Sequence, residues 1–270
     1  MHVHYEITIM VVDKKELSRK VKRLSEGILS KTVDMMLVSI YFGLEASFSG
    51  YSKTGLAGEK AITDLSEFNY ETIRNTLSYL KRRGLVGAVK EKILLTEITK
   101  EGKKRLNSIL PSYEEKRIWD GLIYLITYDL PRQRNIQRNL LREYLKRIVC
   151  GSLQYSVWVT PYNPKKLIEE FVEKHNLDKE LILISSLGRD GTIGEFDLRE
   201  LMEKVYNLSG LNSRYINFIE DVKNKTIVSK EQLLFTFLSI LKDDPQIPFD
   251  LLSEDWVGDK AYVLFKDYLK

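Results

Sequence analysis

The chain has 270 residues, of which 43% are hydrophobic and 30% are charged. This balance is typical of a folded globular protein and excludes a largely disordered chain. No apolar run approaches the roughly 18 residues that a membrane-spanning helix needs, and the first residues lack the order of a signal peptide. We therefore expect a cytoplasmic protein with no membrane partner. The single cysteine, Cys150, suits a reducing compartment and is interpreted as a packing residue.

The formal net charge of +4 is unevenly distributed along the chain. Residues 1–117 carry 21 lysines and arginines against 15 aspartates and glutamates, whereas residues 118–270 carry 21 against 23. A polyanionic partner is therefore expected at the N-terminal end of the chain.

Residues 1–29 predict an N-terminal extension. Its first part, residues 5–12, favours a short strand, and residues 13–28 have the apolar spacing of an amphipathic helix. We expect this helix to pack on a neighbouring domain or subunit.

Residues 30–115 predict a winged helix-turn-helix domain. Helical patterns cover residues 32–48 and 59–65, and a third helix begins after Asn69 and ends at Gly84, which favours a left-handed cap. A strand, a basic turn, a second strand and a helix capped by Thr99 follow. Helices followed by a β-ribbon are the order of a winged helix.

The third helix carries the candidate DNA-binding residues. Leu77 and Leu80 share one face, so polar side chains occupy the other. A helix of this width fits the major groove, where Arg74, Asn75 and Arg82 have donors for base edges. Basic residues at the helix end and on the wing can contact phosphates. The full candidate set is Tyr70, Thr72, Arg74, Asn75, Ser78, Tyr79, Lys81, Arg82, Arg83, Lys90 and Lys92.

Two alternatives for this domain stay open. In the first, Lys81, Arg82 and Arg83 form only a solvated helix end. In the second, the winged helix contacts another protein rather than double-stranded DNA.

Residues 116–187 predict a ferredoxin-like domain. The pattern gives a buried strand over residues 122–128, an amphipathic helix over 135–149, strand-like alternation over 153–160, a helix over 165–175 and a strand over 181–185. The order β-α-β(β)-α-β is that of a split βαβ unit.

One carboxylate, Asp129, follows the first strand of this domain. Duplicated across a two-fold axis, it could hold Mg²⁺ and support phosphodiester hydrolysis. Alternatively, Asp129 accepts hydrogen bonds near Arg132 and Arg134 at the start of the next helix. One carboxylate per chain beside two arginines is a sparse metal site, so a metal is expected only if the nuclease hypothesis holds.

Residues 188–270 predict a C-terminal helical domain. Helices are expected over residues 197–207, 213–223 and 229–241, followed by an extended crossing at Pro245 and Pro248 and a closing helix. The predicted fold class is thus α+β, with an N-terminal winged helix-turn-helix, a central ferredoxin-like domain and a C-terminal helical domain.

Three segments carry a family resemblance. They are TIRNTLSYLKRRGLV in the third helix, WDGLIYLITYDLP with SLQYSVWVTP in the central domain, and DDPQIPFDLLSEDWVGDKAYVLF near the C-terminus. Together they resemble the phenylacetate-catabolism repressor family, the PaaX-type transcriptional regulators. The C-terminal segment is the most specific, although Ile247 and Ser253 replace the usual leucine and proline. Its matching residues are Asp244, Pro245, Pro248, Leu251, Leu252, Asp255, Trp256 and Gly258.

This resemblance implies a homodimeric, sequence-specific repressor that an acyl-CoA-type effector releases from DNA. The central domain also resembles the small ferredoxin-like nuclease-fold subunit of the CRISPR spacer-adaptation machinery, through Tyr128-Asp129 and residues 154–157. That family dimerises through this domain, and its first-strand aspartate is the proposed metal ligand. The alternative hypothesis is therefore a Mg²⁺- or Mn²⁺-dependent nuclease or a DNA-integration scaffold.

Overall fold

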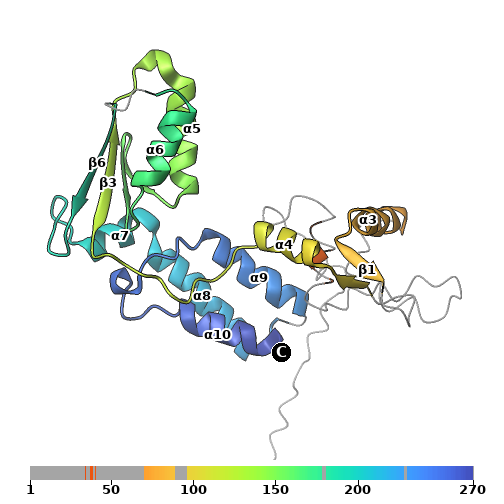
Figure 1. Cartoon of the computed structure of the whole chain (residues 1–270). Helices are drawn as coiled ribbons and strands as arrows, with labels where there is room; N and C mark the ends of the chain where they lie inside the picture. The colour runs from red at the N-terminus through yellow and green to blue at the C-terminus, as the bar shows by residue number, and fades with distance from the viewer. Residues whose placement is uncertain are drawn as a thin grey trace, which may run out of the picture. The chain divides into compact units, whose positions relative to one another are not determined.

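The computed structural model describes residues 34, 37–38, 40, 70–88, 96–177, 181–227 and 230–269. These residues form an α+β fold with eight α-helices, two short 3₁₀-helices and six strands (Figure 1). The α+β class is therefore confirmed. The strand and helix predicted within residues 1–29, and most of the first two helices of the predicted winged helix, lie outside the described residues.

The chain divides into two compact units. The first contains residues 1–112, 217–242 and 260–270, and the second contains residues 113–216 and 243–259. The boundaries predicted at residues 29, 115 and 187 stay predictions. None of the helices in the described ranges is long and apolar enough to cross a membrane.

The first unit contains a helix, a two-stranded ribbon and a second helix in sequence. These are α3 (Tyr70–Arg82), β1 (Val86–Ala88), β2 (Thr96–Ile98) and α4 (Lys100–Ile109). The two strands pair antiparallel, with Val86 opposite Ile98. The predicted third helix, wing strands and Thr99-capped helix are therefore present at the expected positions.

The C-terminal helices contribute an aromatic core to the first unit. They are α8 (Leu208–Lys223), α9 (Lys230–Asp243) and α10 (Gly258–Leu269). The ring of Phe237 in α9 stacks on that of Phe265 in α10 with centroids 4.2 Å apart. The ring of Phe218 in α8 lies 5.5 Å from that of Phe237. Burying each such side chain contributes about 1.5–3 kcal/mol.

Helix α8 begins five residues earlier than the sequence predicts. It starts at Leu208, directly after Asn207, which adopts a left-handed conformation with φ of 51° and ends α7 (Leu198–Tyr206). Asparagine tolerates this conformation better than most residues. The chain therefore leaves α7 without a glycine, at the residue where the first of these helices was predicted to end, and only the start of the next helix was predicted too late.

The second unit is built on a four-stranded antiparallel sheet. Its elements are β3 (Ile123–Tyr128), the 3₁₀-turn η2 (Arg132–Arg134), α5 (Asn135–Arg147), β4 (Gly151–Gln154), β5 (Val157–Thr160), α6 (Lys165–Lys174) and β6 (Ile182–Leu187). The strand order is β4-β5-β3-β6, and α5 and α6 lie side by side on one face of the sheet (Figure 1). This is the split βαβ arrangement that the sequence predicts.

The core of the second unit lies between this sheet and its two helices. Ile126 and Trp158 of the sheet, Leu141 and Leu145 of α5 and Phe171 of α6 are all buried within it. Ile136 and Leu140, which the sequence places on the same apolar side of α5, are instead 76% and 44% exposed. The buried stripe of α5 is narrower than its stripe of apolar residues, because the sheet covers only part of that apolar side.

The predicted strand over residues 153–160 is in fact a hairpin. A turn at Tyr155 and Ser156 separates β4 from β5, which pair antiparallel with a register shift between Ser152 and Gln154. The sequence has no asparagine-glycine or similar signal here. The tight turn was therefore hidden within an apparently continuous alternation.

Candidate functional site

The exposed face of α3 is the first candidate interface. Thr76 and Leu80 are buried, whereas Asn75, Ser78 and Tyr79 are exposed. This division agrees with the predicted outward face of the helix. The side chains of Tyr70, Thr72 and Arg74 lie outside the described part of the chain, so their positions stay predictions.

A glycine cap fixes the basic end of α3. Gly84 has φ of 66°, the N–H of Leu85 donates to Leu80 O at 3.0 Å, and the N–H of Gly84 donates to Lys81 O at 3.0 Å. These two bonds form a Schellman motif, which confirms the left-handed cap. Lys81, Arg82 and Arg83 are exposed, and the cap places them together at the C-terminal end of α3.

Thr99 joins the ribbon to this cap. Its backbone N–H donates to Leu85 O at 3.0 Å, and its hydroxyl donates to Gly84 O. The same hydroxyl oxygen accepts the N–H of Gly102 at 3.1 Å and so caps α4, as predicted. One residue thus holds the end of α3, the base of the ribbon and the start of α4 together, through its side chain and its backbone. Lys90 and Lys92, on the predicted wing tip, lie outside the described residues.

A basic groove lies beside the end of α3. It has a volume of about 520 Å³ and is lined by Tyr79, Arg83, Leu85, Glu101, Lys104, Arg105 and Ser108. Arg83 donates to the Tyr79 hydroxyl at 3.1 Å, and Arg105 is paired with the buried Asp34. Lys104 lies in the same groove as Arg83 and is therefore a further candidate for DNA contact. It was not among the residues predicted to bind DNA. The Lys103-Lys104-Arg105 run after Thr99 was the available signal.

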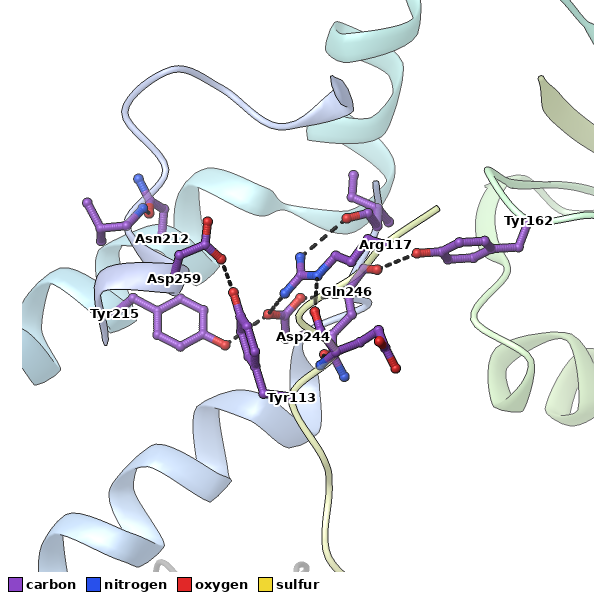
Figure 2. A network of polar contacts seen from close by, with 11 residues as sticks. Tyr113, Arg117, Tyr162, Asn212, Tyr215, Asp244, Gln246 and Asp259 are labelled. Carbon is purple, nitrogen blue, oxygen red and sulfur yellow. Dashed lines mark hydrogen bonds and ion pairs between the residues drawn. The ribbon is translucent and has the colours of Figure 1, made fainter. Parts of the chain in front are cut away.

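A buried ion pair organises the second unit (Figure 2). Arg117 Nη2 lies 3.6 Å from Asp244 Oδ2, and both side chains are enclosed. Arg117 also donates to Ile247 O at 3.3 Å and to Glu114 O at 3.3 Å. Its guanidinium lies over the rings of Tyr113 and Phe249, 4.9 and 4.7 Å from their centroids. The polar segment of residues 112–117 therefore ends in a buried anchor.

Asp244 accepts hydrogen bonds from two further groups. The Tyr215 hydroxyl donates to it at 2.9 Å, and the N–H of Gln246 donates at 2.7 Å. Burial raises the pKa of Asp244, and the positive charge of Arg117 opposes that rise. The hydroxyls of Tyr215 and Tyr113 have raised pKa values, chiefly through burial, so both act as hydrogen-bond donors at neutral pH.

The extended crossing between α9 and α10 closes this cluster. Gln246, in a left-handed conformation with φ of 49°, accepts the N–H of Glu114 through its side chain at 2.6 Å and the Tyr162 hydroxyl through its backbone at 2.6 Å (Figure 2). Further along, Asn212 donates to Asp255 O at 3.1 Å and accepts the N–H of Val257 at 2.9 Å. Two residues of the C-terminal signature thus anchor the crossing, Asp244 through its side chain and Asp255 through its main-chain oxygen.

Gly258 explains why the signature ends as it does. A Cβ at this position would lie 2.7 Å from Nε1 of Trp256, which is closer than such atoms approach. The buried Trp256 ring packs edge-on against Tyr215, with centroids 5.6 Å apart. The start of α10 therefore needs a residue without a side chain.

Two family models match the chain over these parts. Residues 116–195 match the PaaX protein central Cas2-like domain, and residues 206–270 match the PaaX-like protein C-terminal domain. The chain belongs to the PaaX-type family of transcription regulators. The family resemblance is therefore confirmed, and the central and C-terminal segments that carry it lie within the two matches, whereas the third-helix segment lies outside both.

One similar solved structure is the uncharacterized protein Rv0674 from Mycobacterium tuberculosis. It shares 13% sequence identity, has a TM-score of 0.51, and the match covers 95% of this chain and 94% of that chain. At this identity the similarity shows the fold alone. None of the curated proteins compared with the chain matches it.

In this PaaX-type chain, two arginines of α5 bind the residues on either side of Asp129 in the Cas2-like domain. Arg138 donates to Leu130 O, and Arg142 donates to the Tyr128 hydroxyl at 3.0 Å and to Tyr155 O at 3.1 Å. Arg142 also lies 3.8 Å from the centroid of the Tyr155 ring. Hydrogen bonding to Arg142 and its positive charge lower the pKa of Tyr155.

This arrangement does not fit a Mg²⁺ site formed by one copy of the PaaX-type chain. Mg²⁺ prefers several oxygen ligands, whereas the exposed Asp129 lies between residues that bind guanidinium groups. Among the described residues, no cluster of three or more His, Cys, Asp or Glu could hold a metal ion. Metal binding at Asp129 stays a prediction that requires ligands from a second copy.

Proposed function

We propose that this PaaX-type regulator binds double-stranded DNA through α3 and the β1–β2 ribbon. The observation that carries the proposal is the order α3, ribbon and α4, with a capped, basic helix end beside the ribbon. Winged-helix proteins use this order to place a helix in the major groove. The first two helices of such a domain are predicted from the sequence.

In this proposal, side chains on the outward face of α3 contact the base edges. Asn75 and Arg82 are exposed and, with Arg74, have the donors that purine edges accept. Lys81, Arg83 and Lys104 contact phosphates, as do Lys90 and Lys92 on the wing. Phosphate contacts provide affinity that falls as salt rises.

The regulator acts as a homodimeric repressor in this proposal. The face of the central sheet away from α5 and α6 supports a dimer contact, because Leu183 is 61% exposed there and pairs with the half-buried Thr127. Two copies of α3 then read half-sites about one helical turn, or a multiple of it, apart. An acyl-CoA-type effector, which the family resemblance implies, releases the dimer from DNA.

The test is binding of the purified chain to DNA from its own upstream region, at two salt concentrations, with and without Mg²⁺. The proposal expects protection of a palindromic site, no need for metal and a strong salt dependence. Equal binding to every sequence, or no binding at either salt concentration, would overturn it. Metal-dependent cleavage lost in Asp129→Ala would move the function to the central domain.

A further inference from the structure

A pocket of about 380 Å³ lies between α6 and the β3–β6 edge of the central sheet. In the sheet register, Tyr124 pairs with Ser186 and Ile126 pairs with Ile184. Ser186 is too small to fill the space opposite Tyr124, which leaves room beneath the first turns of α6. The pocket has the volume of a small-molecule site.

Four aliphatic side chains form the apolar part of the pocket wall. Ile168 and Val172 come from α6, and Ile182 and Ile184 come from β6. The first three are less than 8% exposed, so they form a preformed apolar surface. The body of a ligand in this pocket must therefore be apolar.

Two opposite charges line the same pocket. Lys165 and Glu169 are four residues apart on α6, so they lie on one face of the helix, one turn apart. Lys165 is the first residue of α6, where the helix dipole favours an anion. Asn163, which also lines the pocket, accepts the N–H of Lys165 at 3.0 Å.

The Tyr124 hydroxyl completes the polar end. It donates to Asp120 at 2.6 Å, and this hydrogen bond, followed by burial, raises the pKa of Tyr124. The phenol therefore stays protonated near neutral pH. With Asp120 already bound to it, Lys165 and Glu169 are the charged groups on the described wall of the pocket.

We propose that this pocket binds a zwitterionic small molecule with an apolar side chain, the chemistry of a free apolar α-amino acid. Its carboxylate meets Lys165 and the start of α6, its ammonium meets Glu169, and its side chain packs on the aliphatic wall. A carboxylic acid without an amino group brings its negative charge close to Glu169 and gives that carboxylate no positive partner. An amine without a carboxylate brings its positive charge close to Lys165 in the same way. The inference does not depend on DNA binding, and an acyl-CoA is too large to be enclosed here.

The test uses calorimetric titration of the full chain with L-leucine, 4-methylpentanoate and 3-methylbutylamine. These share one apolar body and differ in the charged groups, and L-phenylalanine with 3-phenylpropionate and phenethylamine provides a second series. One L-amino acid should bind at one site per chain, about tenfold or more tighter than its acid and its amine. Absence of binding by both amino acids, or equal or tighter binding of the acid or the amine, would overturn the proposal.

Matched variants on α6 identify the two charges. Lys165→Ala should remove the advantage of the amino acid over the amine, and Glu169→Gln should remove its advantage over the acid. The neighbouring substitutions Lys166→Ala and Glu170→Gln should change neither, because neither residue lines the pocket. Ser186→Leu, at an exposed position, should fill the pocket and abolish binding; retained binding in a folded variant would place the ligand elsewhere.

Discussion

The guanidinium of Arg117 lies 3.6 Å from the carboxylate of Asp244, and the two side chains are 0% and 1% exposed. Removing one member leaves the other charged group buried without its partner. We expect Asp244→Leu to lower the free energy of unfolding by roughly 3–5 kcal/mol. Urea unfolding followed by circular dichroism measures the change.

A double substitution separates the pair from the rest of the cluster. Arg117→Met with Asp244→Leu removes both charges, so it should cost less than the sum of the two single substitutions. Glu143→Ala, which breaks the exposed Lys146–Glu143 pair, should cost less than about 1 kcal/mol. Additive effects of the two core substitutions would contradict the pairing.

Gly102 and Gly87 should differ in their response to alanine. A Cβ at Gly102 would collide with the carbonyl oxygen of Leu85 and lie 2.8 Å from Cγ2 of Ile98, whereas nothing lies within 4 Å of a Cβ at Gly87. Gly102→Ala should therefore lower the melting temperature even though alanine is the better helix former. Gly87→Ala should leave the melting temperature nearly unchanged. Equal changes of melting temperature in the two variants would be inconsistent with this packing.

Cys150 should be nearly inert toward thiol reagents in the folded protein. Burial raises the pKa of its thiol to about 12, although a hydrogen bond with Thr160 acts in the opposite direction. At about pH 8 the thiolate fraction is then roughly a thousandfold below that of an ordinary cysteine. Stopped-flow labelling with a disulfide reagent, with and without urea, tests this. Fast labelling without urea would show that the thiol is accessible.

The same shift predicts a pH dependence of stability. Because folding raises the pKa of Cys150, its contribution is complete below the unfolded value of about 9 and is lost as pH rises toward about 12. Cys150→Ser should flatten this part of the stability curve. Urea unfolding at several alkaline pH values compares the two proteins.

Arg74 and Lys104 should differ in how they affect DNA binding. Arg74→Ala should weaken binding to the specific site by roughly 1–3 kcal/mol and leave other DNA unchanged, if Arg74 reads a base. Lys104→Ala should weaken all DNA alike and reduce the salt slope by about one. Fluorescence anisotropy at several salt concentrations gives both quantities. Selective loss on one sequence in Lys104→Ala would contradict a phosphate contact.

Asp129 tests the alternative function directly. Asp129→Ala should leave specific DNA binding unchanged, because Asp129 lies in the central domain rather than on α3. Incubation of labelled DNA with Mg²⁺ or Mn²⁺ should give no cleavage in either protein. Cleavage by the unsubstituted chain alone would establish the nuclease hypothesis.

Local patterns in the sequence determined most elements of this protein. The periodicity of α3, α5 and α6, the cap at Gly84 and the cap at Thr99 each depend on neighbouring residues, so one sequence sufficed to predict them. The split βαβ order followed from those elements, and the three family segments were visible as strings of residues.

The tertiary structure decided how distant residues meet. Arg117 ends a run of polar residues in the sequence, and only the fold places it against Asp244, because a buried charge requires a partner that no local pattern specifies. Only the fold likewise shows that Ile136 and Leu140 are exposed. The pocket between β6 and the residues Lys165 and Glu169 also depends on how distant elements pack. Periodicity identifies the side of a helix that can be buried, whereas the position of the sheet determines how much of that side is covered.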